Sequence, residues 1–429
     1  MRCDIAVIGA GPAGLAAAAA ATGRQVVVVD LAARPGGQYY RHPLGGRPTR
    51  GWRTFEMLRR DTLVLSDHKV FAIEAGPPHV LHMLGEIKEL RADKILVATG
   101  AYDRQVPFPG WELPGVLTAG GAQALVKGSR VLPGRRIVVA GTGPFLLPVA
   151  AGLAKHVVAV FDAGSPAGFR RYPGVLARHP GKIVEAAGYL ASLARHGVPL
   201  RTRHTVVAAH GTDELTAVTV AGPGGTRRIE CDTLAIGYGF TPQVDLGLAL
   251  GCVTRTTAGA LVLDVDDRQQ TSVPGVYAAG EVTGVGGAAW ALATGALAGR
   301  AMAGLPATER LVRARVRHAT FAATLARVWP TPDGWLDGLT DDTVICRCEE
   351  VRCGTVRAAV AELGACDARA VKLLTRTGMG WCQGRICGEA VACIVGRLTN
   401  TTPDATTMAR RTLAQPVTLG ELARTEEDA

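Results

Sequence analysis

One pattern occurs twice in this chain and restricts the folds that the chain can adopt. In the first copy, an apolar strand over residues 4–8 runs into Gly9-Ala10-Gly11-Pro12-Ala13-Gly14 and an alanine-rich helix, and a second strand ends at Asp30. In the second copy, a strand over 136–140 enters Gly141-Thr142-Gly143-Pro144-Phe145-Leu146, and a later strand ends at Asp162. Each acid stands 21 positions after the first glycine. This order predicts two α/β units of the kind that bind dinucleotides.

The residues of the first copy suit a pyrophosphate. Gly9 allows a tight turn, Gly11 lets the backbone touch the phosphates, and Gly14 lets the helix pack closely on the strand. The helix N-terminus offers free N–H groups, and Asp30 can accept a ribose hydroxyl. A glycine-tightened helix without a ligand is the alternative, and the complete strand–helix–strand context favours a nucleotide.

The second copy departs from this pattern. Leu146 stands where glycine or alanine would let helix and strand approach closely. Asp162 favours an unphosphorylated ribose, and hence NAD over NADP. Two interpretations stay open: NAD or another adenine nucleotide bound at Gly141, Gly143 and Asp162, or a retained but empty fold.

Seven of the ten cysteines lie between Cys346 and Cys393. Four of them form a CxC and a CxxxxC, at Cys346, Cys348, Cys382 and Cys387. Four thiolates can hold a 2Fe–2S cluster. Structural zinc is the alternative, although it usually takes CxxC pairs. The others in this stretch (Cys353, Cys366 and Cys393) are expected to be buried small residues, with Cys353 as a candidate substitute ligand.

Composition and charge exclude several classes of protein. Hydrophobic residues make up 48% of the chain and charged residues 20%, so long disorder is not expected. The net charge of +10 comes from scattered basic pairs and aromatics are only 5%, which argues against nucleic-acid binding. The start of the chain lacks a signal peptide, and the apolar run over 15–21 is too short to span a bilayer, so the sequence predicts a soluble, cytoplasmic protein. No acid–base constellation marks catalytic residues.

Three further stretches follow the first glycine turn: Pro35-Gly36-Gly37-Gln38, a strand over 94–98 ending in Thr99-Gly100, and 271–281 ending in Gly280-Glu281. In this order they resemble the two-dinucleotide flavoproteins of the glutathione-reductase-like fold. The resemblance implies FAD in the first unit, with Gly280-Glu281 near the flavin ribityl chain, where the family usually has Asp. The FAD-binding residues expected on this basis are Gly9, Gly11, Pro12, Ala13, Gly14, Asp30, Gly36, Gly37, Gln38, Thr99, Gly100, Gly280, Glu281, Gly287 and Ala288.

The cysteine segment resembles the bacterioferritin-associated-ferredoxin-like domain. With the stretches 98–104, 237–242, 378–385 and 416–420, the chain resembles the flavin-bearing α subunits of heteromeric amine and imino-acid dehydrogenases. That group includes the A-type subunit of opine oxidase, the B-type subunit of hydrogen cyanide synthase, D-hydroxyproline dehydrogenase and dye-linked proline dehydrogenase α chains. Trp381 departs from the proline expected before Cys382. The resemblance implies an FAD-dependent β subunit that oxidises the amine, while this chain transfers electrons between flavin and iron–sulfur centres. A small 2Fe–2S subunit is a further candidate partner.

The predicted architecture is therefore an α/β two-dinucleotide-binding flavoprotein with a small helical iron–sulfur domain. Two other functions remain: a self-sufficient NADH-dependent FAD/iron–sulfur reductase, and a non-enzymatic scaffold subunit with zinc on the four cysteines. The expected boundaries are 1–128 and 230–305 for the FAD-binding domain, 129–229 for the inserted NAD-binding-like domain, 306–340 for a linker helix, 341–398 for the 2Fe–2S domain and 399–429 for a tail.

Overall fold

The two glycine-turn repeats fall in separate units of the computed structural model, which describes residues 1–43, 45–46, 51–60, 62–409, 411 and 413–427. The first unit consists of Met1–Tyr102, Thr241–Ala323 and Arg410–Ala429. The second unit consists of Asp103–Phe240 and Thr324–Ala409. Residues 103–128 and 230–240, expected with the FAD-binding domain, thus lie in the second unit, and the cysteine segment groups with them.

The first unit is built on a mixed sheet in the order β3-β2-β1-β6-β5-β4. Strands β1, β2, β3 and β6 run parallel, and β19 pairs in parallel with the second half of β6. The antiparallel neighbour β5 pairs with the first half of β6. The elements are β1 (Arg2–Ile8), α1 (Pro12–Ala20), β2 (Val26–Val29), α2 (Trp52–Arg59), β3 (Leu63–Leu65), β4 (Lys69–Glu74), β5 (His79–Leu84), β6 (Glu89–Val97), α7 (Asp245–Ala249), β17 (Thr254–Thr257), β18 (Ala260–Leu263), β19 (Val276–Ala278), α8 (Gly287–Met302) and α14 (Leu419–Glu427).

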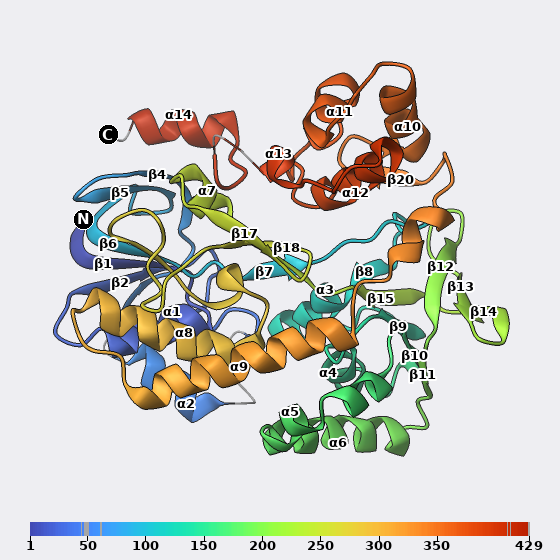
Figure 1. Ribbon diagram of the computed structural model, residues 1–429, viewed down its shortest axis with the longest axis horizontal. Coiled ribbons are helices and arrows are strands. Elements are labelled where there is room, and N and C mark those ends of the chain that lie inside the picture. The colour runs from blue at the N-terminus through green and yellow to red at the C-terminus, as the bar shows by residue number, and fades with distance from the viewer. Residues whose placement is uncertain (44, 47–50, 61, 410, 412, 428–429) are drawn as a thin grey trace. The chain divides into compact units, whose positions relative to one another are not determined.

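Helices α1 and α8 pack side by side against this sheet (Figure 1). Their contact depends on small residues, because a Cβ on Gly295 would lie 2.1 Å from the carbonyl oxygen of Ala13. A Cβ on Gly299 would meet the carbonyl of Ala17 at the same distance. The alanine-rich sequence of α1 therefore allows the helix that starts at the first glycine turn to lie directly on α8.

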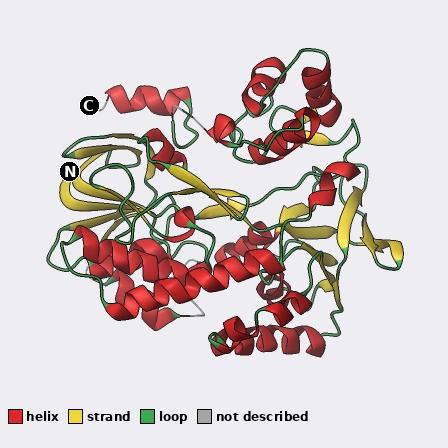
Figure 2. Cartoon of the chain, viewed as in Figure 1, coloured by secondary structure: helices red, strands yellow, loops and turns green. Residues whose placement is uncertain are grey.

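The second unit contains a five-stranded parallel sheet in the order β11-β10-β9-β15-β8 and an antiparallel sheet of β12, β13 and β14, drawn in yellow in Figure 2. Parallel strands read as continuous apolar runs because both faces are covered, and all five residues of β9 are buried. The elements are β8 (Val116–Thr118), α3 (Ala119–Ala124), β9 (Ile137–Gly141), α4 (Leu146–Gly152), β10 (Val157–Asp162), α5 (Pro173–Ala177), α6 (Pro180–Arg195), β11 (Leu200–Thr202), β12 (Thr205–His210), β13 (Ala217–Gly222), β14 (Gly225–Glu230) and β15 (Thr233–Gly237).

The cysteine segment is helical, as the sequence predicts. Helices α10, α11 and α12 enclose a core that includes the fully buried Val356, Val371 and Val391. Cys353 belongs to this core, whereas Cys366 is exposed, so the expectation of a buried Cys366 is wrong. The elements are β20 (Val344–Cys346), β21 (Val351–Arg352), α10 (Cys353–Ala361), α11 (Ala368–Thr375), α12 (Gly388–Thr399) and α13 (Thr406–Ala409).

The strands and the α-helix not yet named span the borders between units: β7 (Ala101–Asp103), β16 (Phe240–Pro242) and α9 (Glu309–Val328). The predicted α/β fold class and both strand–turn–helix–strand repeats are confirmed. Within the described part of the chain, none of the helices has both the length and the apolar character needed to cross a bilayer.

Candidate functional site

The first candidate site lies at one edge of the sheet of the first unit. The carboxyl ends of β1, β2, β6 and β19 meet there because these strands are parallel. That edge carries the glycine turn after β1, Asp30 after β2, Thr99-Gly100 after β6 and Gly280-Glu281 after β19. Residues that are far apart in the sequence thus come to one place, which is where ligands bind in open α/β sheets.

Close backbone packing explains the glycines of this turn. Gly9 has φ +109°, and a Cβ there would lie 2.4 Å from the carbonyl oxygen of Ala98. A Cβ on Gly14 would lie 1.8 Å from the carbonyl oxygen of Gly9, so a larger residue would displace the helix from the turn. Gly37 faces Gly11, since a Cβ on Gly37 would lie 2.9 Å from the Gly11 Cα. The tight turn and the close helix packing expected from the sequence are both present.

Asp30 is hydrogen-bonded to the glycine turn. Its Oδ2 accepts a hydrogen bond from the Ala10 N–H (2.5 Å), and its Oδ1 accepts one from the Ala32 N–H (2.7 Å). Burial raises the pKa of Asp30. The predicted loop is attached to the same turn, because the Gly36 N–H donates to the Ala10 carbonyl oxygen (2.7 Å). Gln38 in this loop is exposed and accepts a hydrogen bond from Arg41 Nε (3.1 Å).

The segment after β19 returns to the first turn. Gly280 has φ +78°, and a Cβ there would lie 2.8 Å from the Ala13 Cβ. Glu281 Oε1 accepts hydrogen bonds from the N–H groups of Gly287 (2.7 Å) and Gly286 (3.4 Å) at the start of α8. Burial nevertheless raises the pKa of Glu281 to about 7. Its carboxyl group therefore changes charge near neutral pH.

The other predicted residues of this edge either form a hydrogen bond within the protein, have a positive φ angle or begin a helix. Thr99 Oγ1 donates to the carbonyl oxygen of Gln243 (2.8 Å), and Gly100 has φ +79°. Gly287, with φ +77°, and the half-buried Ala288 begin α8, and Pro12 begins α1.

The second glycine turn follows β9. Gly141 has φ +136°, and a Cβ there would lie 1.8 Å from the carbonyl oxygen of Gly237. Asp162 Oδ1 accepts hydrogen bonds from the N–H groups of Gly143 (3.3 Å) and Gly164 (2.9 Å). Asp162 Oδ2 accepts one from the indole Nε1–H of Trp329 (2.9 Å), a residue that the sequence pattern does not single out. The turn and its acid thus come together as predicted, with a third, unexpected participant.

The four predicted cluster cysteines meet as two thiol pairs. Cys346 lies within hydrogen-bonding reach of Cys387, and Cys348 within reach of Cys382. Cys382 also acts electrostatically on Cys387, and Cys346 on Cys348, so the two pairs lie within electrostatic range of each other. In the described part of the chain, no set of three or more His, Cys, Asp or Glu side chains is arranged closely enough to hold a metal ion as it stands. The pairing brings together the donor types that an iron–sulfur cluster uses.

Backbone N–H groups converge on one of these sulfurs. The Gly378 N–H donates to Cys346 Sγ (3.4 Å). The Cys387 thiol, together with N–H groups of Gly378, Glu349 and Cys348, lowers the pKa of Cys346 to about 6. A thiol surrounded by donors is a good ligand because the thiolate is the binding form.

Several contacts that join the cysteine segment to the rest of the second unit have no signature in the sequence. Arg104 Nε lies 3.0 Å from Glu389 Oε1, and Arg104 Nη1 donates to Thr331 Oγ1 (2.7 Å). Trp111 Nε1 donates to the carbonyl oxygen of Val344 (2.6 Å). The guanidinium of Arg347 lies 5.2 Å from the centre of the Trp111 ring. These contacts involve residues more than 200 positions apart, so local patterns could not have indicated them.

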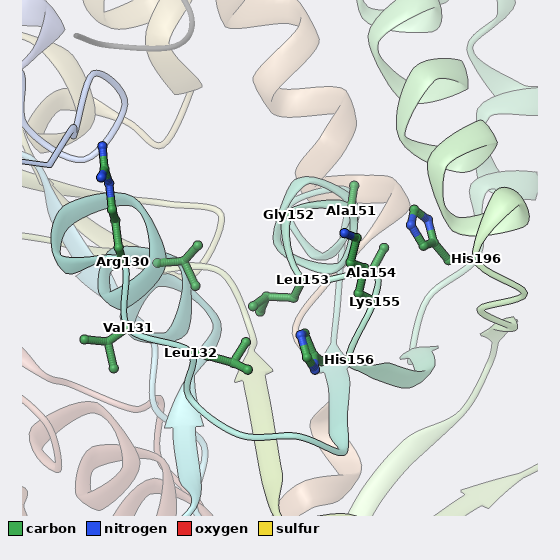
Figure 3. A pocket seen from close by; sticks show the side chains of 11 residues that line it. Arg130, Val131, Leu132, Ala151, Gly152, Leu153, Ala154, Lys155, His156 and His196 are labelled. Atoms are coloured by element: carbon green, nitrogen blue, oxygen red, sulfur yellow. The ribbon is translucent and has the colours of Figure 1, made fainter. Parts of the chain in front are cut away.

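A surface pocket of about 460 Å³ lies elsewhere in the second unit (Figure 3). Lys155 and His156 lie between Arg130 on one flank and His196 on the other (Figure 3). The pocket adjoins the start of β10, at the opposite edge of the sheet from the Gly141 turn. It therefore belongs to neither predicted site.

Comparison with known proteins identifies the fold family. Residues 3–303 match the pyridine nucleotide-disulphide oxidoreductase family. The chain belongs to this family. It is thus an FAD-dependent oxidoreductase of α/β fold, because membership of this family indicates FAD as the cofactor.

Curated relatives extend over nearly the whole chain. The chain is 35% identical to the hydrogen cyanide synthase subunit HcnB of Pseudomonas aeruginosa, over 89% of this chain and 90% of that protein. It is 33% identical to the A-type subunit of opine oxidase from Rhizobium meliloti, over 98% of both. Among solved structures, the L-proline dehydrogenase from P. horikoshii matches with a TM-score of 0.72 and 21% identity, covering 99% of this chain and 80% of that one. The relatives are named as subunits, whereas the structural match shows the shared fold alone.

Proposed function

We propose that this chain is the electron-transfer FAD/2Fe–2S subunit of a heteromeric amine, imino-acid or opine dehydrogenase or oxidase. The observation that carries the proposal is the meeting of four cysteines as two thiol pairs in a flavoprotein whose relatives are oxidase and synthase subunits.

FAD in the first unit would use the edge formed by β1, β2, β6 and β19. Gly11 leaves the backbone open to a pyrophosphate, whereas Gly9 and Gly14 let the turn and α1 pack closely. The N-terminus of α1 would face the phosphates. Asp30 lies at the ribose end of the site, and Glu281 at the segment that the resemblance associates with the ribityl chain. Bound flavin supplies transfer of one or two electrons. The protein contributes the phosphate-facing backbone, and a carboxyl group at Glu281 that can hold a proton near neutral pH.

The cluster would be held by Cys346, Cys348, Cys382 and Cys387, and when bound it supplies one-electron transfer. The donor set fits, because thiol pairs come from both halves of the segment and the Gly378 N–H already points to a sulfur. Donors to the sulfurs are a recognised influence on cluster potential.

A thiol route for electrons is less well supported. In the first unit, Cys3 and Cys252 are both buried, and burial raises the pKa of each. Cys252 donates to Thr271 Oγ1 (3.4 Å) instead of facing another sulfur. We therefore assign amine oxidation to an FAD-dependent partner protein, and a small 2Fe–2S subunit would be a further partner.

Metal and sulfide analysis of the purified chain tests this proposal. About two irons and two acid-labile sulfides per chain are expected. Cys387→Ser should lose most of the iron, while Cys366→Ser, an exposed cysteine of the same segment, should keep it. Zinc in place of iron, or equal iron in both variants, would contradict the proposal. The amine, supplied with the partner protein, should reduce the flavin. Over the same time, NADH added without oxygen should leave the flavin oxidised.

A further inference from the structure

The acid that would bind the ribose in the second unit is already occupied. Asp162 is only 7% exposed. As at Asp30, both carboxylate oxygens accept hydrogen bonds from the protein, but one of the donors to Asp162 is a side chain. The oxygen that does not face the glycine loops accepts the indole Nε1–H of Trp329 at 2.9 Å. In dinucleotide-binding folds, a carboxylate at this place accepts a ribose hydroxyl. The indole N–H thus makes the hydrogen bond that a ribose would make.

The indole ring also fills space above the glycines. A Cβ on Gly164 would lie 2.2 Å from Trp329 Cδ1, so the ring rests directly on the backbone of Gly164. A Cβ on Gly143 would lie 3.8 Å from the Trp329 Cβ. Gly143 is the glycine that lets the backbone approach a pyrophosphate, and the side chain nearest to it is Trp329.

Neighbouring residues hold the tryptophan in this position. The ring of Phe169 packs edge-on against Trp329, with centroids 5.5 Å apart. Val328 packs beside Gly168, where a Cβ would lie 3.1 Å from Val328 Cγ1. The backbone N–H of Trp329 continues the helix by donating to the carbonyl oxygen of Leu325 (2.8 Å). Trp329 is therefore fixed by a helix end, an aromatic neighbour and a buried carboxylate.

The phosphate-binding part of the fold is weakened independently. Helix α4 begins at Leu146, five residues after Gly141, whereas α1 begins at Pro12, three residues after Gly9. Helix α4 has seven residues, compared with nine in α1. The first helical N–H groups of α4 therefore lie further along the chain from the turn that would present them to a phosphate.

We propose that Trp329 occupies the ribose position of the second dinucleotide fold and closes it to NAD and other adenine nucleotides. The occupant of this fold is the chain itself, through the Val328–Trp329 segment that leads into the cysteine segment. The proposal concerns the second unit and holds whether or not the four cysteines carry iron.

Equilibrium dialysis of the flavin-loaded chain against NAD⁺ and ADP-ribose tests it. The wild-type chain should show no saturable binding up to about 1 mM, and Trp329→Ala should gain at least about tenfold in affinity. Val184→Ala, an exposed side chain in the same unit, should behave as the wild type. Stoichiometric binding by the wild type, or a folded Trp329→Ala chain that binds no better, would overturn the proposal.

A second measurement does not depend on the Trp329→Ala variant. Trp329→Phe keeps an aromatic ring and identifies the indole N–H resonance of Trp329 by its disappearance. In the wild type that N–H should exchange slowly with solvent, because it is bonded to a buried carboxylate. Addition of NAD⁺ should leave it unshifted. Fast exchange, or a shift that saturates with NAD⁺, would overturn the proposal.

Discussion

The two glycine turns share a framework and differ in what lies on it. In both, the acid after the second strand accepts a hydrogen bond from a turn N–H and another from the residue two positions further on: Ala10 and Ala32 for Asp30, Gly143 and Gly164 for Asp162. At the first turn, the backbone of Gly37 faces Gly11. At the second, an indole ring lies on the glycines and bonds to the acid.

This difference shows how one fold can serve two purposes. At the first turn, the only atom of the described residues within 4 Å of a Cβ on Gly11 would be the Gly37 Cα, at 4.0 Å, and we propose that this backbone binds FAD. The second unit uses its surface to hold its own C-terminal segment, through Trp329, the Arg104–Glu389 ion pair and the Trp111–Val344 hydrogen bond. The second dinucleotide fold of this chain thus serves as a contact surface for a protein segment.

The largest effect should come from a side chain at the first turn. Gly11 has φ −77°, which any residue adopts, and its nearest neighbour in the direction of a Cβ is the Gly37 Cα at 4.0 Å. Gly11→Val should therefore fold but obstruct the pyrophosphate position. FAD affinity should fall at least about 100-fold, equivalent to about 2.8 kcal/mol, measured by flavin titration. If Gly11→Val retained one FAD per chain, the first turn would not be part of the FAD site.

Removing the ion pair between Arg104 and Glu389 should have the next largest effect. The Arg104 and Glu389 side chains are only 11% and 27% exposed, so Arg104→Gln leaves a largely buried carboxylate without its cation. The free energy of unfolding should fall by about 2 kcal/mol, measured with urea. Arg313→Gln disrupts an exposed pair with Glu309 and should cost less than about 0.5 kcal/mol. Equal costs would mean that Arg104 does not anchor the segment.

A methyl group at the second turn should affect stability but not flavin. Gly143 has φ +94°, so Gly143→Ala should cost about 1–2 kcal/mol of stability and leave the FAD content unchanged. Gly188→Ala, in the interior of α6 with open space around it, should instead stabilise by about 0.5–1 kcal/mol. Loss of FAD from Gly143→Ala would show that the second turn takes part in flavin binding.

The protonation of Glu281 should make stability depend on pH. Its pKa is raised from 4.5 to about 7 in the folded chain, so the folded state holds a proton that the unfolded state has released. The free energy of unfolding of the flavin-free chain should therefore fall as pH rises from about 4.5 to about 7, and level off above that. Glu281→Gln should remove this slope. An unchanged slope in the variant would assign the titration to another group.

The sequence predicted the turns well because their requirements are local. A positive φ at Gly9 and the close helix approach at Gly14 each restrict a residue type at a fixed spacing. The contact between Trp329 and Asp162 joins residues 167 positions apart, and a tryptophan at the end of a helix carries no signal of its partner. The expectation for Cys366 fails for a related reason. Free cysteines tend to be buried, but the path of the loop before α11 leaves this one exposed.

The most direct test is to count the nucleotides released when the purified, untreated chain is denatured. We expect one FAD per chain and no second adenine nucleotide, because we propose that the first turn binds FAD and that Trp329 fills the second. Release of NAD, ADP or ATP in equal amount with FAD would contradict it.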